Sequence, residues 1–102
     1  MKECCKKYLH EQFGGDADVM SEIYGEYVSS MKAKIDEART AIAEKQWVQL
    51  DRVAHTIKGN SLAAGDEEMA NVAIELRGAS KQEDEAMSAS LIEKLEELYG
   101  LL

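Results

Sequence analysis

The chain has 102 residues, no proline and a formal net charge of -8, and 45% of its residues are hydrophobic. This size suits one domain and excludes an enzyme built from separate cofactor and substrate domains. The 20 acidic residues outnumber 12 basic ones that form no cluster, which argues against a nucleic-acid partner, and no apolar run approaches the roughly 20 residues that cross a membrane.

The N-terminal segment, residues 1–13, is predicted to form a short helix with Tyr8, Leu9 and Phe13 as its apolar contacts. It lacks the apolar stretch of a secretory signal. We therefore expect a soluble protein of the cytoplasm, and the acidic excess is expected to keep it monomeric.

The two cysteines of the chain, Cys4 and Cys5, are adjacent. A disulfide between neighbouring residues is strained, so both are expected to be reduced thiols near a mobile end. Together with His10 they match no standard zinc spacing, and we predict neither a metal site nor a function for His10.

A long helix is predicted after the Gly14–Gly15 break. Apolar residues recur there every three or four positions over about seven turns, a period that no strand produces. They are Met20, Ile23, Tyr24, Tyr27, Met31, Ile35, Ala38 and Ile42. Asp16 or Asp18 is expected to cap the start of this helix.

Three shorter helices follow, the first over residues 46–64 and ending at Gly65, which suits a left-handed turn. Asp66 is expected to cap the next helix, which is predicted to stop at Gly78. The last helix is expected to begin at a capping box, Ser80–Glu83, in which Ser and Glu satisfy each other's free backbone amides. The predicted buried residues of the helix capped by Asp66 are Met69, Val72, Ala73 and Leu76. Those of the last helix are Met87, Leu91, Ile92, Leu95, Leu98 and Leu102.

We therefore predict an all-α fold: an antiparallel four-helix bundle over residues 16–102, with a short extra N-terminal helix over residues 1–13. Each helix has a single apolar stripe, and the connections are short, so the helices bury their stripes against one another. The whole chain, residues 1–102, is predicted to be one domain.

The segment Leu50–Ser61 contains a pattern that a purely structural helix does not need. On a helical wheel, His55 lies opposite the buried side. The buried positions are Leu50, Val53, Ile57, Ser61 and Ala64. Gly59, one turn beyond His55, costs about 1 kcal/mol relative to alanine and leaves the imidazole uncovered on that side. Val48 and Leu62 flank His55, which gives the partly apolar, flat surface of a protein docking site.

The imidazole of His55 suits a phosphoryl carrier. It is largely neutral in the cytoplasm, so one ring nitrogen offers a lone pair for attack on phosphorus. Lys58, three residues on and on the same face, can hold its ammonium near the phosphoryl oxygens. The chain has no glycine-rich loop for ATP, so the phosphoryl group has to come from another protein.

The octapeptide Ala54–Ser61, AHTIKGNS, followed by Gly65, closely resembles the AHxLKGSS…G signature of histidine-containing phosphotransfer (Hpt) domains. These are the four-helix-bundle carriers of bacterial and eukaryotic two-component phosphorelays. Glu44–Trp47 resembles the family's link before the histidine helix, and Phe13–Asp16 resembles the entry into its first long helix. Residues 65–76 match the next helix without a gap, so the resemblance covers essentially the whole chain.

The resemblance implies a role for three residues of the octapeptide. His55 would be phosphorylated on the ring nitrogen farther from the backbone, Lys58 would contact the phosphoryl group, and Gly59 would admit the partner's active site. The departures from the family pattern are Ile57 for leucine, Asn60 for a small residue and Arg77 for a frequent glutamate. The last of these is expected to alter the choice of partner and hardly the chemistry.

We expect a non-enzymatic phosphocarrier that exchanges its phosphoryl group with the aspartate of response-regulator receiver domains and serves a (hybrid) histidine kinase. The receiver supplies the Mg²⁺, so the chain needs no cofactor of its own. Val48 and Leu62 are expected to dock the partner. Asp51 and Arg52 are interpreted as surface charges that tune the choice of partner.

Two other functions stay open from the sequence. The bundle could dock receiver or kinase domains without being phosphorylated, although a docking surface needs neither His55 nor Lys58. The chain could also be a small acid–base catalyst that uses His55, although a convex helix surface offers no evident pocket.

Overall fold

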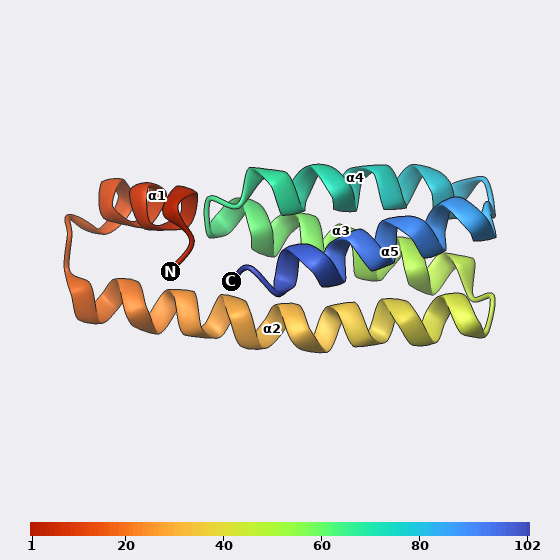
Figure 1. Ribbon diagram of the computed structural model, residues 1–102, viewed down its shortest axis with the longest axis horizontal. Helices are drawn as coiled ribbons and strands as arrows, with labels where there is room; N and C mark the ends of the chain where they lie inside the picture. The colour runs from red at the N-terminus through yellow and green to blue at the C-terminus, as the bar shows by residue number, and fades with distance from the viewer.

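The computed structural model of the protein describes residues 1–102 and contains five helices and no strand. The helices are α1 (Glu3–Phe13), α2 (Ala17–Ala43), α3 (Trp47–Ala63), α4 (Glu67–Lys81) and α5 (Glu85–Tyr99). Figure 1 shows α2 along the whole length of the molecule and α1 beside its N-terminal part. None of the five is both long and apolar enough to cross a membrane. The prediction of an all-α fold is confirmed.

Four of the helices form a bundle in which successive helices are neighbours. Helices α2 and α4 each pack against α3 and α5, whereas the Cα atoms of the diagonal pairs stay more than 8 Å apart. Helix α1 packs against α2 at the end of this bundle. The largest fully buried apolar side chains are Leu9, Met31, Leu50, Ile57, Met69, Leu76, Ile92 and Leu95. The predicted four-helix bundle with a short N-terminal helix is therefore confirmed.

Three aspartates stand directly before helices and cap them. The Asp16 carboxylate accepts hydrogen bonds from the main-chain N–H groups of Asp18 and Val19, at 3.1 and 3.2 Å, so Asp16 rather than Asp18 is the cap of α2. Asp66 and Asp84 each accept a bond from the N–H three residues on, at 3.3 and 3.0 Å. These bonds satisfy donors that the first turn of a helix leaves free.

The turn between α3 and α4 requires glycine at position 65. Gly65 has a left-handed φ of +77°, and a Cβ built there would lie 2.3 Å from Cβ of Tyr8. Helix α1 therefore packs closely against this turn. The left-handed turn predicted at Gly65 is confirmed.

Helix α4 ends three residues later than the sequence predicted. The predicted stop at Gly78 is wrong because the helical bonds continue through it, and the N–H of Gln82 still donates to the Gly78 carbonyl at 3.3 Å. The predicted capping box at Ser80–Glu83 is also wrong. Ser80 is buried inside α4, where its hydroxyl donates to the Arg77 carbonyl at 2.9 Å, and Asp84 caps α5 instead.

Two apolar side chains are exposed where the sequence predicted apolar contact. Phe13, the last residue of α1, is 43% exposed, and Met87 is 55% exposed. Because α5 starts at the Asp84 cap, its first inward position is Ser88 rather than Met87. Leu91 and Leu102, which were also predicted to be buried, are half-buried, and Leu102 lies beyond the end of α5.

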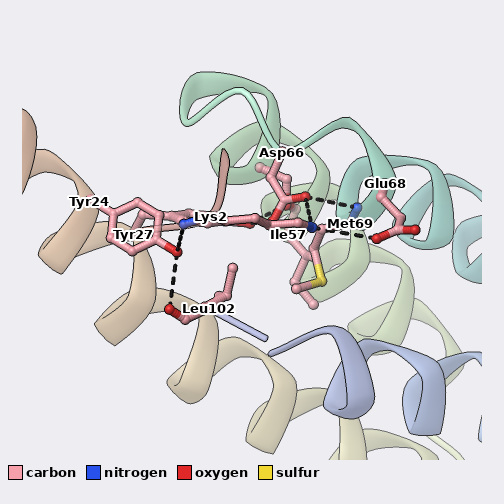
Figure 2. A network of polar contacts seen from close by, with 9 residues as sticks. Lys2, Tyr24, Tyr27, Ile57, Asp66, Glu68, Met69 and Leu102 are labelled. Carbon is pink, nitrogen blue, oxygen red and sulfur yellow. Dashed lines mark hydrogen bonds and ion pairs between the residues drawn. The ribbon is translucent and has the colours of Figure 1, made fainter. Parts of the chain in front are cut away.

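A polar network joins the N-terminus to the bundle (Figure 2). Nζ of Lys2 lies 2.8 Å from Oδ1 of Asp66, and the Tyr27 hydroxyl donates to Oδ2 of the same carboxylate at 2.8 Å. The main-chain N–H of Lys2 donates to the Tyr24 hydroxyl at 3.1 Å, and that hydroxyl donates to the Leu102 carbonyl at 3.3 Å. Asp66 is fully buried, so these donors stabilise a charge that would be costly to bury alone.

Cys5 lies in the core beside this network and not at a mobile end, which corrects the expectation for this thiol. It is a free cysteine, as is Cys4. Burial and the negative charge of Asp66 raise the pKa of the Cys5 thiol to about 12. The thiol therefore stays protonated at neutral pH and behaves as a small apolar side chain.

Candidate functional site

His55 lies near the middle of α3, on the exposed side of the helix. The other side is anchored in the core by Leu50, Val53, Ala54, Ile57 and Ser61. Rotation of α3 about its axis would expose these residues, so the packing holds the imidazole at the surface. The wheel-based expectation that His55 is exposed agrees with this geometry.

The surface one turn beyond His55 is open. Gly59 is exposed, and a Cβ built on it would meet nothing within 4 Å. The packing of the fold therefore does not require glycine here, and what the missing side chain provides is space above the helix. Lys58 is half-buried and forms no ion pair within the chain, so its ammonium is available to an anion from outside.

The imidazole of His55 has one side-chain partner, Arg77 from α4. Nη1 of Arg77 lies 3.1 Å from Nδ1 of His55, and Nε of Arg77 lies 3.1 Å from Oδ1 of Asp51. Asp51 and His55 stand one turn apart on α3, so a single guanidinium joins both of them across the α3–α4 contact. No side chain hydrogen-bonds to Nε2, which stays accessible.

We define the α3 face as the predicted site residues on the outer side of this helix: Val48, Asp51, Arg52, His55, Lys58, Gly59 and Leu62. Its two apolar members are exposed, Val48 by 71% and Leu62 by 49%. Shallow grooves border the face at both ends, one lined in part by Val48 and the other in part by Leu62 and the α1 residue Tyr8. The structure therefore places an apolar contact on each side of His55.

Two residues of α4 extend this face and were not predicted as part of it. Arg77 was expected to affect partner choice alone, but it contacts His55 directly. Ile74, three residues earlier and so on the same side of α4, is 50% exposed. The position of Ile74 outside the apolar stripe of its helix was a usable signal. The contact of Arg77 had none, because it joins two helices through residues 22 positions apart.

Asn60 and Ser61 hold α3 from its inner side. The side-chain amide of Asn60 donates to the Ser30 hydroxyl of α2 at 2.9 Å. The Ser61 hydroxyl donates to the Ile57 carbonyl at 2.7 Å. The Tyr27 hydroxyl of α2 lies 3.4 Å from the same Ser61 hydroxyl. Asn60, a departure from the family's small residue, thus links the histidine helix to its neighbour.

These residues together offer an exposed imidazole, a free ammonium and open space on a convex surface. A ring nitrogen can accept a phosphoryl group, and an ammonium can balance the charge of that group. No cluster of His, Cys, Asp and Glu in the chain could hold a metal ion. The arrangement fits a reaction in which a second protein supplies the remainder of the active site.

Comparison with protein families matches residues 22–102 to the Hpt domain. The match includes α3, α4, α5 and most of α2, and therefore every residue of the α3 face. Helix α1 and the segment Phe13–Asp16 lie outside it. No curated protein and no solved structure matches the chain.

Proposed function

Because the chain belongs to the Hpt domain family, whose members are phosphocarrier modules of phosphorelays, we propose that it is a histidine phosphocarrier with His55 as its phosphorylated residue. The observation that supports this most directly is the exposure of His55 beside the open surface at Gly59. The other histidine of the chain, His10, lies in α1, outside the segment that matches the family.

In the proposed reaction, the neutral ring of His55 carries its proton on Nδ1, apart from Arg77, so that the lone pair of Nε2 attacks the phosphorus of a receiver's phospho-aspartate. The N–P bond forms while the P–O bond to the aspartate breaks, and the aspartate leaves as a carboxylate. The imidazole loses one proton to water, so the product ring is neutral. The reverse steps, with uptake of one proton by the ring, pass the phosphoryl group to the aspartate of another receiver.

Lys58 and Gly59 are proposed to assist this transfer in different ways. The ammonium of Lys58, free of any ion pair, would approach the phosphoryl oxygens and offset their negative charge. Gly59 would let the loops of the receiver's active site approach Nε2 without meeting a side chain. The chain itself then supplies a positioned nucleophile on a rigid helix.

The proposed partners are receiver domains and a histidine kinase, as is usual for the family. Val48 and Leu62 would pack against an apolar patch of the receiver, and the charges of Asp51 and Arg52 would favour some receivers over others. The acidic site of the receiver would hold the Mg²⁺, so we propose no cofactor on this chain. Its proposed location is the cytoplasm, where such receivers act.

Transfer from a receiver that carries labelled phospho-aspartate tests the proposal. We expect the wild-type chain to take up an acid-labile label, the His55→Gln variant to take up none, and the matched His10→Gln variant to behave as the wild type. Undiminished labelling of His55→Gln would contradict the assignment. A wild-type chain that binds its receiver but takes no label would instead favour the unphosphorylated docking module.

A further inference from the structure

The contact between Arg77 and His55 constrains the protonation of the imidazole. A guanidinium has only donors, so at 3.1 Å from Nη1 the Nδ1 atom of His55 has to accept with its lone pair. The neutral free ring then holds its proton on Nε2, so Arg77 has to leave Nδ1 and the proton has to move there before Nε2 can attack. Asp51 accepts from Nε of the same guanidinium at 3.1 Å. This bond fixes the orientation of the Arg77 guanidinium and balances its positive charge. Both side chains of this ion pair are about three-quarters buried, with exposures of 27% and 28%.

The same geometry matches the ring after phosphorylation. With the phosphoryl group on Nε2, a neutral ring has one lone pair left in its plane, and this lone pair is on Nδ1. That is the atom to which Arg77 donates. The guanidinium can therefore return to its place once the phosphoryl group is on the opposite nitrogen.

Loss of the phosphoryl group depends on a proton at that atom. When Nδ1 is protonated, the N–P bond breaks with its electron pair returning to Nε2, and the ring leaves as neutral imidazole. Without this proton the leaving group would be an imidazolate anion, which is far less stable. A donor that occupies the Nδ1 lone pair, and a positive charge beside it, both oppose the protonation.

We propose that Arg77, held by Asp51, is a positioning residue that keeps Nδ1 of phosphorylated His55 unprotonated and so prolongs the life of the phosphoryl group on the carrier. This inference rests on the proposed function of His55. Release to a receiver aspartate then requires that docking separates Arg77 from Nδ1. The ring takes up a proton from water, the N–P bond breaks, and the aspartate oxygen forms the new bond to phosphorus.

The test uses phosphoramidate as a small phosphoryl donor, so that no docking defect enters. After the donor is removed, the half-life of the phosphoryl group is measured at constant pH in the wild type, Arg77→Ala, Arg77→Lys and Asp51→Asn. The matched control is Arg39→Ala, because Arg39 also forms an ion pair between two helices, with Glu96 of α5. ¹⁵N NMR of the phosphorylated ring reports in parallel whether Nδ1 holds a proton.

We expect Arg77→Ala to shorten the half-life about tenfold, which corresponds to about 1.4 kcal/mol in the barrier, and to raise the protonated fraction of Nδ1. Arg77→Lys, which keeps a charged donor, is expected to restore part of the lifetime, Asp51→Asn to lose part of it, and Arg39→Ala to match the wild type. Equal half-lives and equal Nδ1 protonation in wild type and Arg77→Ala would overturn the inference and leave the proposed function intact. A wild-type chain that takes no phosphoryl group on His55 would overturn both.

Discussion

The ammonium of Lys2 lies 2.8 Å from the carboxylate of Asp66, the residue that caps α4. This ion pair joins the start of the chain to the turn that follows the histidine helix, and Tyr27 donates to the second oxygen of the same carboxylate. The segment before residue 22 lies outside the family match, yet it is tied to a fully buried carboxylate of the bundle. Helix α1 is therefore an integral part of the folded chain.

Replacement of Lys2 by methionine tests this link. Burial lowers the pKa of Lys2, but the hydrogen bond and charge of Asp66 outweigh it, so that the pKa lies above 10.5. The stabilisation is therefore fully present below pH 10.5 and is lost as the pH rises through the folded-state pKa. We expect Lys2→Met to lower the free energy of unfolding by about 1–3 kcal/mol at neutral pH, and the difference from wild type to narrow above pH 10.5. Denaturant unfolding measures this free energy at each pH. The control is Lys7→Met, because Lys7 is exposed and forms no ion pair. Equal stability at neutral pH would contradict the role of this ion pair.

Gly59 and Gly25 allow a matched test of the open surface beside His55. Both lie exposed within helices, and a Cβ at either position would meet nothing within 4 Å. Gly59→Gln and Gly25→Gln should each leave the chain as stable or up to about 1 kcal/mol more stable. Only Gly59→Gln should slow transfer from a phosphorylated receiver, by about tenfold or more, equivalent to ~1.4 kcal/mol in the barrier. Transfer at the wild-type rate by Gly59→Gln would show that the space is not used.

Lys58 provides a test of charge compensation. Its ammonium has no ion-pair partner in the chain, so removing it should not disturb the fold. We expect Lys58→Ala to slow phosphoryl transfer about tenfold, through loss of one charge-assisted hydrogen bond of ~1.5 kcal/mol or more. The control is Lys94→Ala on α5, the helix diagonal to α3 in the bundle. Rapid-quench kinetics give both rates, and an equal rate for the two variants would remove Lys58 from the mechanism.

Leu62 tests the docking role of the α3 face. A glutamate there puts a charge into the expected apolar contact. Leu62→Glu should therefore raise the dissociation constant for a receiver by about tenfold or more. Met87→Glu is the matched control, because Met87 is about as exposed as Leu62 but lies on α5, the helix diagonal to α3 in the bundle. Titration calorimetry distinguishes the two. Weakening of equal size in both variants would indicate a general effect of charge rather than docking through Leu62.

The helices themselves were predictable because each has a single apolar stripe with a clear period. The stripe of α2 is buried at Met20, Tyr24, Tyr27, Met31, Ile35, Ala38 and Ile42, and only Ile23 is half-buried. The end of α4 was not predictable by the same means. Glycine at position 78 costs helix stability, but the buried side chains of Ala79 and Ser80 hold one more turn in place.

The predicted site followed from one helix, and what was missed depends on a second. The wheel places His55, Lys58 and Gly59 on one side of α3 because a helix fixes the directions of its own side chains. The position of Arg77 over Nδ1 depends on how α4 packs against α3, which no spacing along the chain encodes. The same holds for Cys5, whose burial depends on the docking of α1.

Locating the phosphoryl group on the wild-type chain tests the assignment of Nε2 of His55 as the nitrogen that carries it. The chain is phosphorylated by a phospho-receiver, kept at neutral to alkaline pH and digested, and tandem mass spectrometry with ¹⁵N NMR then locates the modified nitrogen. We predict a phosphoryl group on Nε2 of His55 and none on His10. A phosphoryl group on His10, or on a residue other than histidine, would contradict this assignment.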